Sequence, residues 1–214
     1  VIYFKFYEGD EYLYNNNIVF DNNNKLCLAL RIRVDDNYDA GYTDLLSIKY
    51  TNQYKFAFNF YRDGDSNVYC YFELADMLGG ATAAYSSTAY LTEEWYTLHL
   101  IIDRTQAVPN DTAKLYVNGV QDTLTFSANS QLPFGHGDSY DITTGLKMQY
   151  TLDYMALLID KTWTQKQINA MVTNKQIWPY TYYWPINEGS GNTIHDLGKF
   201  GKDLTNVGGR WRPL

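Results

Sequence analysis

The chain has 214 residues, of which 45% are apolar, and it carries a formal net charge of −7 at pH 7. All-β sandwiches often reach this length as a single domain with one sizeable core, so we expect one domain over residues 1–214. The acidic balance and the absence of a Lys/Arg block exclude a typical nucleic-acid partner, because phosphate backbones are bound through clustered positive charge. The sequence has no run of 18 apolar residues, so it predicts no membrane-spanning helix.

Tyrosine stands out in the composition, with 21 Tyr among aromatic residues that make up 17% of the chain. Tyr favours strands, and its apolar ring with a polar tip also suits a contact surface. The chain opens on Val1 with neither a Met nor a signal-peptide pattern, which favours a processed chain or an excised piece. Cys27 and Cys70 fall inside predicted strands and are expected to be small buried hydrophobes rather than a disulfide.

The first third of the chain consists of short strand-like segments separated by polar turns. The clearest alternation places Leu and Ile on one face of residues 26–34, with Cys27, Ala29, Arg31 and Arg33 on the other. A period of two with a polar far side predicts a strand that is buried on one face. The run Asn15-Asn16-Asn17 is expected to break the chain between two strands. The expected strands up to residue 74 cover 2–7, 11–14, 18–20, 26–34, 45–50, 55–61 and 68–74.

The middle of the chain carries its strongest hairpin signal. We expect a long surface loop over 75–92, with one irregular edge strand at most, and then strands over Trp95–Asp103 and Ala113–Val117. Asn118-Gly119 follows the second strand, and both residues tolerate the positive φ that a type I′ turn requires. The loose region 127–141 precedes the last expected core strands, 142–150 and 151–159.

A short helix is predicted near the C-terminus. Thr164 can cap it, and Gln167 three residues later completes a capping box. Apolar residues then recur at helical spacing, at Ile168, Met171 and Val172. Pro179 makes continuation of the helix past Trp178 unfavourable.

The central segment resembles a laminin-G-like domain of the concanavalin A-like lectin and glucanase superfamily. The resemblance rests on Trp-Tyr-Thr-Leu from Trp95, an aliphatic run ending in Asp103, and Leu-Tyr-Val-Asn-Gly-Val. The run Asp-Lys-Thr-Trp-Thr-Gln-Lys-Gln-Ile from Asp160 is similar to the closing element of such domains. The resemblance implies an all-β jelly-roll sandwich of two antiparallel sheets with one short helix near the C-terminus. It supplies no function by itself, because one fold hosts many functions.

The tail, residues 180–214, resembles the motif that usually opens such a domain, with an aromatic strand followed by Asn-Glu-Gly-Ser-Gly. Two explanations are open. The order is circularly permuted, so that this region completes the sandwich from its C-terminal side, or the chain continued into a further module and was cut. Apolar side chains favour the first explanation, namely Trp184, Ile186, Ile194, Leu197 and Leu204.

The sequence predicts no enzyme. Glycosidases of the lectin-like fold carry paired acids within a Glu-x-Asp-x-x-Glu run, and retaining hydrolysis needs carboxylates about 5 Å apart. That run is absent, and Asp153 is the one acid on its strand, with Met155 on its own face. Glu93 and Glu94 are adjacent and would point to opposite faces of a strand. The three His residues show no spacing to a nucleophile or to one another that predicts catalysis or a metal site.

Two loops have the alternating oxygen side chains of a partial calcium site. In the loop 63–67, Val68 stands where a helix–loop–helix calcium loop needs Gly, which favours a plain polar turn. Laminin-G-like domains often hold one calcium at a sheet rim through Asp and backbone carbonyls. By that analogy the preferred Ca²⁺ ligands are Asp35, Asn37 and Asp39.

A candidate binding face follows from strand alternation. If Phe56, Phe58 and Phe60 face the core, their neighbours face outward, together with alternate residues of the adjoining strands. Sugars bind such surfaces, because their C–H faces stack on aromatic rings while amides and acids bond the hydroxyls. Should these strands share one sheet, the glycan-binding residues are Asn59, Tyr69, Tyr71, His99 and Tyr116. Loop tyrosines, including Tyr38, Tyr42 and Tyr85, offer a second site at the rim.

The preferred function is therefore a non-catalytic carbohydrate-binding or adhesion module that recognises a glycan or cell-surface polysaccharide. The competing class is a structural subunit of a surface or bacteriophage virion appendage, in which the same fold serves self-association or packing against neighbouring chains. Lectin-like domains rich in Asn and Tyr resemble those of bacterial surface proteins and phage appendages. The resemblance implies an extracellular location or a place on a cell or virion surface.

Overall fold

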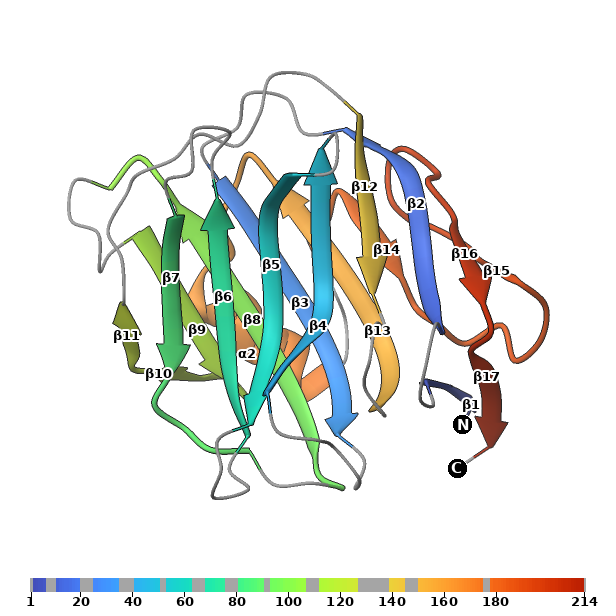
Figure 1. Ribbon diagram of the computed structural model, residues 1–214, viewed down its shortest axis with the longest axis horizontal. Coiled ribbons are helices and arrows are strands. Elements are labelled where there is room, and N and C mark those ends of the chain that lie inside the picture. The colour runs from blue at the N-terminus through green and yellow to red at the C-terminus, as the bar shows by residue number, and fades with distance from the viewer. Residues whose placement is uncertain are drawn as a thin grey trace.

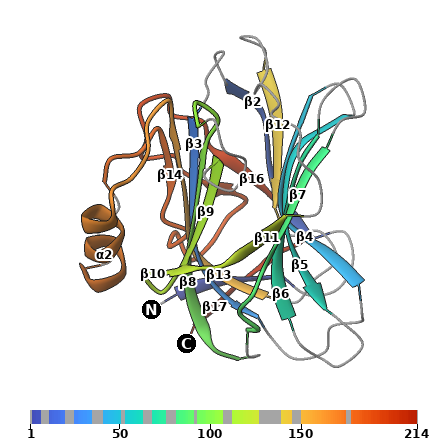
Figure 2. The same ribbon diagram turned by 90° about the vertical axis from the view of Figure 1, so that its left-hand side faces the viewer.

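Two antiparallel sheets pack face to face in a computed structural model of the protein (Figures 1 and 2). The arrangement confirms the predicted all-β jelly-roll sandwich. None of the helices in the described part is long and apolar enough to cross a membrane. The structure describes residues 2–6, 11–19, 25–34, 41–50, 53–62, 68–75, 81–90, 93–106, 112–126, 139–144, 150–174 and 178–213.

Within these residues each sheet draws strands from both ends of the chain. Sheet A runs in the order β10 (Val120–Asp122), β9 (Ala113–Val117), β8 (Trp95–Asp103), β3 (Lys25–Val34), β13 (Tyr150–Ile159), β1 (Ile2–Phe6) and β17 (Arg210–Pro213), and β14 (Tyr182–Trp184) also pairs with β13. Sheet B runs in the order β11 (Leu124–Phe126), β7 (Ala81–Ser86), β6 (Val68–Ala75), β5 (Gln53–Arg62), β4 (Gly41–Tyr50), β12 (Ser139–Thr144), β2 (Tyr12–Val19), β16 (Leu204–Val207) and β15 (Thr193–Ile194).

The main core lies between the two sheets. The aliphatic face of β3 is at most 1% exposed, and it meets Phe56, Phe58 and Phe60 from β5. These residues follow the predicted alternation. Burying such side chains stabilises the fold by about 1.5–3 kcal/mol each before entropy is considered. Cys27 and Cys70 are free and buried, as expected from the sequence.

The outer face of sheet A is covered by the helix α2 (Gln165–Asn174), which Figure 2 shows beside that sheet. Ile168 and Met171 pack on Cys27 and Ala29 of β3 in a second apolar cluster. The prediction that β3 is buried on one face only is therefore wrong. The reason is a non-local one, since α2 comes from a segment more than 130 residues further along the chain.

The predicted capping box starts α2. The Gln167 N–H donates to Thr164 Oγ1 at 3.3 Å, and the Thr164 N–H donates to Gln167 Oε1 at 2.8 Å. The helix also contacts the β9–β10 hairpin, because Gln165 Nε2 donates to the Gly119 carbonyl at 2.8 Å. Helix and hairpin thus hold each other in place.

The Asn118-Gly119 turn has the predicted geometry. Its φ angles are 50° and 85°, and Val117 pairs with Val120 across it. The Asn118 side chain adds a further tie, since its Oδ1 accepts the Thr97 N–H at 2.9 Å. This turn therefore joins β8, β9 and β10 as one unit.

Two irregular positions depart from the simple alternation. The strand β2 runs straight through Asn15-Asn16-Asn17, where a break was expected, and a register shift opposite β12 absorbs the extra residue. A second shift lies between Leu152 and Tyr154 of β13. It turns Asp153 toward Arg31, with which it forms a salt bridge, so the expectation that Asp153 shares a face with Met155 is wrong.

The C-terminal residues contribute to both sheets. β14 pairs with β13, β16 pairs with β2, and β17 pairs with β1, so that Ile2 stands opposite Pro213 and the chain ends lie side by side (Figure 1). Fully buried side chains of this region join the main core, namely Tyr182, Trp184, Ile186, Ile194 and Leu204. Leu197 is 57% exposed and does not join it, so the expectation that it is too apolar for solvent is wrong.

Candidate functional site

A group of tyrosines gathers on the outer face of sheet B. On β5 and β6 the residues that alternate with the buried Phe side chains point away from the core. Pairing sets them side by side, with Tyr71 opposite both Asn59 and Tyr85, and Tyr61 opposite Tyr69. We call the following residues the tyrosine face: Asn59, Tyr61, Tyr69, Tyr71, Glu73 and Tyr85.

Three rings of the tyrosine face are in contact through Tyr85, and all four rings remain partly open. The Tyr71 and Tyr85 ring centroids are 4.7 Å apart, and those of Tyr61 and Tyr85 are 6.1 Å apart with an angle of 75° between the planes. All four tyrosines are half-buried. Edge contacts of this kind restrain the rings, so a partner meets a preformed surface rather than mobile side chains.

Polar groups lie among these rings. Asn59 is 5% exposed and sits between Tyr71 and β4. Tyr71 Oη donates to Glu73 Oε2 at 3.4 Å. Partial burial, with the nearby Glu73 carboxylate, raises the pKa of Tyr71 to about 12, so this phenol keeps its proton at neutral pH. The face therefore offers hydrogen-bond donors and acceptors beside apolar ring surfaces.

Three of the predicted glycan-binding residues, Asn59, Tyr69 and Tyr71, come together on this face. Tyr85, predicted to lie in a rim loop, is on β7 and belongs to the same surface. Tyr42 pairs through its backbone with Tyr61, at the adjoining position of β4. Tyr38 lies outside the described residues.

His99 and Tyr116 do not belong to this surface. They lie opposite each other on β8 and β9, which are strands of sheet A, and α2 covers that face. His99 is 0% exposed and Tyr116 is 7% exposed. The prediction that these two side chains join an open patch is therefore wrong, because the patch required all the strands to share one sheet.

The environment of His99 is that of a core residue. Its ring meets the Trp163 ring at a centroid distance of 5.9 Å and an angle of 89°. Neither ring nitrogen has a hydrogen-bond partner in the described part of the chain. Burial lowers the pKa of His99 to about 4, so the imidazole is neutral at pH 7.

The predicted calcium ligands Asp35, Asn37 and Asp39 lie outside the described residues, as does the loop 63–67. Among the side chains that the structure does describe, no group of three His, Cys, Asp or Glu could hold a metal ion.

Acidic side chains of the tail accept hydrogen bonds from backbone N–H groups. Asp196 Oδ1 accepts the N–H groups of Tyr183 and Gly198 at 2.8 and 2.7 Å, and its Oδ2 accepts the Lys202 N–H at 2.9 Å. Glu188 accepts the His195 N–H at 2.8 Å. These carboxylates organise the turn 195–203, a role that the sequence motif did not reveal.

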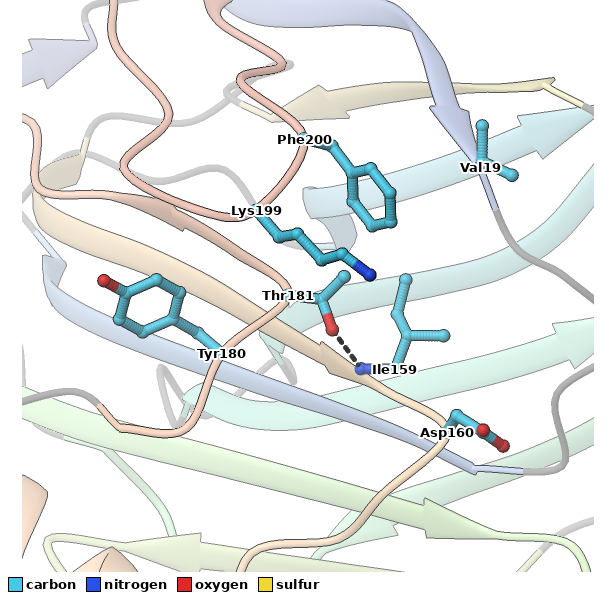
Figure 3. A pocket seen from close by; sticks show the side chains of 7 residues that line it. All are labelled: Val19, Ile159, Asp160, Tyr180, Thr181, Lys199 and Phe200. Atoms are coloured by element: carbon cyan, nitrogen blue, oxygen red, sulfur yellow. Dashed lines mark hydrogen bonds between the residues drawn. The ribbon is translucent and has the colours of Figure 1, made fainter.

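A hollow of about 370 Å³ lies beside this turn (Figure 3). Segments far apart in the sequence build it, at the ends of β2 and β13, at the approach to β14 and in the turn after Asp196. Sequence reasoning missed it, because no local pattern links the residues that line it: Val19, Ile159, Asp160, Tyr180, Thr181, Lys199 and Phe200.

Comparison with known proteins supports the fold. No model of a protein family matches the sequence, and no curated protein matches it. Among solved structures, a heptameric SAP-like pentraxin from Limulus polyphemus matches with a TM-score of 0.67 and 12% identity, over 98% of this chain and 94% of that one.

Two toxin domains are also similar. The binding domain of botulinum neurotoxin DC, solved in complex with SialylT, matches with a TM-score of 0.52 and 14% identity, over 83% of this chain and 47% of that one. The botulinum neurotoxin type G receptor-binding domain matches with a TM-score of 0.52 and 11% identity, over 96% and 61%. At these identities the likeness shows the lectin-like jelly roll alone, and the laminin-G-like family in particular stays a resemblance.

Proposed function

We propose that the protein is a non-catalytic carbohydrate-binding module and that the tyrosine face is its glycan-binding surface. The observation that carries the proposal is the set of four half-buried tyrosine rings on adjacent strands, three of them in contact through Tyr85, with Asn59 and Glu73 among them. Sugar C–H faces stack on such rings, while amide and carboxylate groups bond the hydroxyls. The similar toxin domain solved with SialylT is consistent with a sugar ligand for this fold.

The non-catalytic part of the proposal rests on two carboxylates that already have partners within the chain. Asp153 pairs with Arg31, and Asp196 bonds three backbone N–H groups. Carboxylates committed in this way are poorly placed for the acid and nucleophile roles of glycoside hydrolysis. The proposed setting is outside the cell, or on a cell or virion surface, where a polysaccharide is within reach.

The tyrosine face is tested by glycan-array binding of the purified monomer. Tyr71→Ala and Tyr85→Ala should each weaken binding about tenfold, because a stacking ring contributes about 1–1.5 kcal/mol beyond its buried area. Tyr183→Ala is the matched control, since Tyr183 is a half-buried tyrosine of sheet A. Unchanged binding in both face variants, with intact melting curves, would refute this assignment.

A structural role makes a different prediction for the same face. If the protein is an assembly subunit, light scattering will show a stable oligomer, and Tyr71→Ala will dissociate it. A monomer that binds glycans selectively contradicts the structural role. An oligomer that binds no glycan contradicts the binding module.

The calcium site at Asp35, Asn37 and Asp39 stays a prediction. A bound ion stabilises the folded state by mass action, so a site saturated at 100 times its dissociation constant adds about 2.7 kcal/mol. Thermal melting in millimolar calcium should then show a raised midpoint that Asp35→Asn with Asp39→Asn removes. A midpoint insensitive to calcium in the unmodified protein would eliminate the site.

A further inference from the structure

We propose that the hollow beside the turn 195–203 binds a sugar unit that carries a carboxylate. It is a site separate from the tyrosine face, because it lies where β2 and β13 end. Its volume of about 370 Å³ falls within the range of small-ligand pockets, which is about 300–1,000 Å³. Its lining is mixed, with aliphatic and aromatic groups beside one ammonium, one carboxylate and the hydroxyls of Thr181 and Tyr180.

The ammonium of Lys199 is the group that favours a ligand with a carboxylate over an uncharged one. Figure 3 shows its side chain crossing the hollow between Phe200 and Thr181. No carboxylate of the described residues forms a salt bridge with it, although the chain as a whole carries a net charge of −7. A cation in a pocket of an acidic protein, with no carboxylate partner among the described residues, favours an anionic ligand over the many neutral sugars.

Thr181 supplies a second donor. Its Oγ1 accepts the Ile159 N–H at 2.9 Å, which leaves the hydroxyl hydrogen able to donate to a ligand (Figure 3). Lys199 and Thr181 are therefore two donors that suit the two oxygens of a carboxylate. Asp160 lines the same pocket and points away from Lys199 in Figure 3, so it suits a sugar hydroxyl at the opposite end.

Phe200 provides the apolar wall. Phe200 is 48% exposed, in contrast to the buried Phe56, Phe58, Phe60 and Phe72, and the centre of its ring lies 5.6 Å from that of the buried Tyr182 ring. Lys199 Nζ is 5.2 Å from the centre of the Phe200 ring. A ring that packs against Tyr182 and is about half exposed is suited to stacking against a pyranose.

The turn that carries these groups is built to a fixed position. The Lys199 N–H donates to the Thr181 carbonyl at 3.1 Å, and Asp196 bonds the Gly198 N–H. A Cβ at Gly198 would stand 2.3 Å from the Thr181 carbonyl oxygen, so only glycine allows this close approach. The backbone positions that carry Lys199 and Phe200 are thus fixed, which reduces the entropy lost on binding.

Ligand-observed NMR titration of the intact chain tests the proposal. The probes are methyl β-D-glucuronide and the methyl glycoside of N-acetylneuraminic acid, each beside its uncharged methyl ester. At least one acid should bind and should lose about fivefold to tenfold in affinity as its ester and in Lys199→Met. Lys199→Arg should retain binding, and added salt should weaken it.

The matched control is Lys166→Met, which removes the same charge from an exposed position on α2. It should leave the affinity unchanged. Equal binding of acid and ester, an unaltered affinity in Lys199→Met, or no binding of either acid would overturn the proposal. Tyr71→Ala should have no effect on these probes, so the result is independent of whether the tyrosine face binds glycans.

Discussion

His99 is completely buried against Trp163, just before α2, and burial lowers the pKa of its imidazole from 6.5 to about 4. The titratable side chains in the surrounding cluster are Cys27, Tyr116 and Tyr154, and burial raises the pKa of each. None of them gains a charge in the acid range. Between pH 6.5 and pH 4 the unfolded chain therefore binds a proton at His99 that the folded chain excludes.

The sign of the effect follows from this difference. Stability contributed by neutral His99 is fully present above pH 6.5 and is lost as the pH falls toward 4, by roughly 3 kcal/mol in total. Urea unfolding at a series of pH values should show the decline. His99→Leu should flatten the curve over this interval relative to the unmodified protein. An equally steep curve in His99→Leu would show that other groups are responsible.

The helix α2 lies on the same outer face of sheet A as this histidine, and its first turn depends on a reciprocal pair of hydrogen bonds between Thr164 and Gln167. The helix buries Ile168 and Met171 on sheet A and contacts the β9–β10 turn through Gln165. A ten-residue helix is marginal alone, so packing and capping together decide whether it stays docked.

Thr164→Ala should lower the free energy of unfolding by about 1 kcal/mol, because it removes the hydroxyl that accepts the Gln167 N–H in the first turn. Chemical denaturation measures the change. Thr173→Ala is the control, since Thr173 is an exposed residue in the same helix. There the substitution should be neutral or slightly stabilising, given the higher helix propensity of Ala. Equal losses in both variants would count against the capping role.

Elements with local signals were predicted well from the sequence. The alternation of β3, the Asn118-Gly119 turn and the Thr164 cap each depend on residues within a few positions of one another. The two bulges were missed, because an extra residue is visible only against the partner strand. The first bulge allows β2 to continue through Asn15-Asn16-Asn17, and the second turns Asp153 toward Arg31.

The residues of the candidate site were likewise predicted correctly only where local strand pairing decides their position. Asn59, Tyr69 and Tyr71 were predicted on one outer face because neighbouring hairpin strands share a sheet. His99 and Tyr116 were misplaced, since the assignment of β8 and β9 to the other sheet depends on long connections. The hollow at Lys199 is built from four distant segments and has no sequence signature at all.

At the scale of the whole molecule, the tail is part of the sandwich. Strands from residues 182–213 pair within both sheets, and side chains such as Tyr182 and Trp184 lie in the main core at 0% exposure. Removing one large core side chain usually costs about 3–5 kcal/mol, so losing several exceeds the stability of a typical domain.

A chain ending at residue 179 should therefore lack a cooperative thermal transition. Circular dichroism in the near ultraviolet, followed during heating, measures this. Trp178→Ala is the control, because Trp178 is 66% exposed and its loss should leave the transition in place. A truncated chain that melts cooperatively would show that residues 1–179 form a domain by themselves, against the prediction of one domain over 1–214.

The pairing of β1 with β17 has a mechanical consequence. Ile2 is opposite Pro213, and the strands run antiparallel from there to Lys5 and Arg210. A load applied through the two termini therefore pulls the strands apart one rung at a time, as a zipper opens, and does not shear several hydrogen bonds at once. Tension between the ends should peel this ribbon at low force, while the rest of the sandwich stays outside the path of the load.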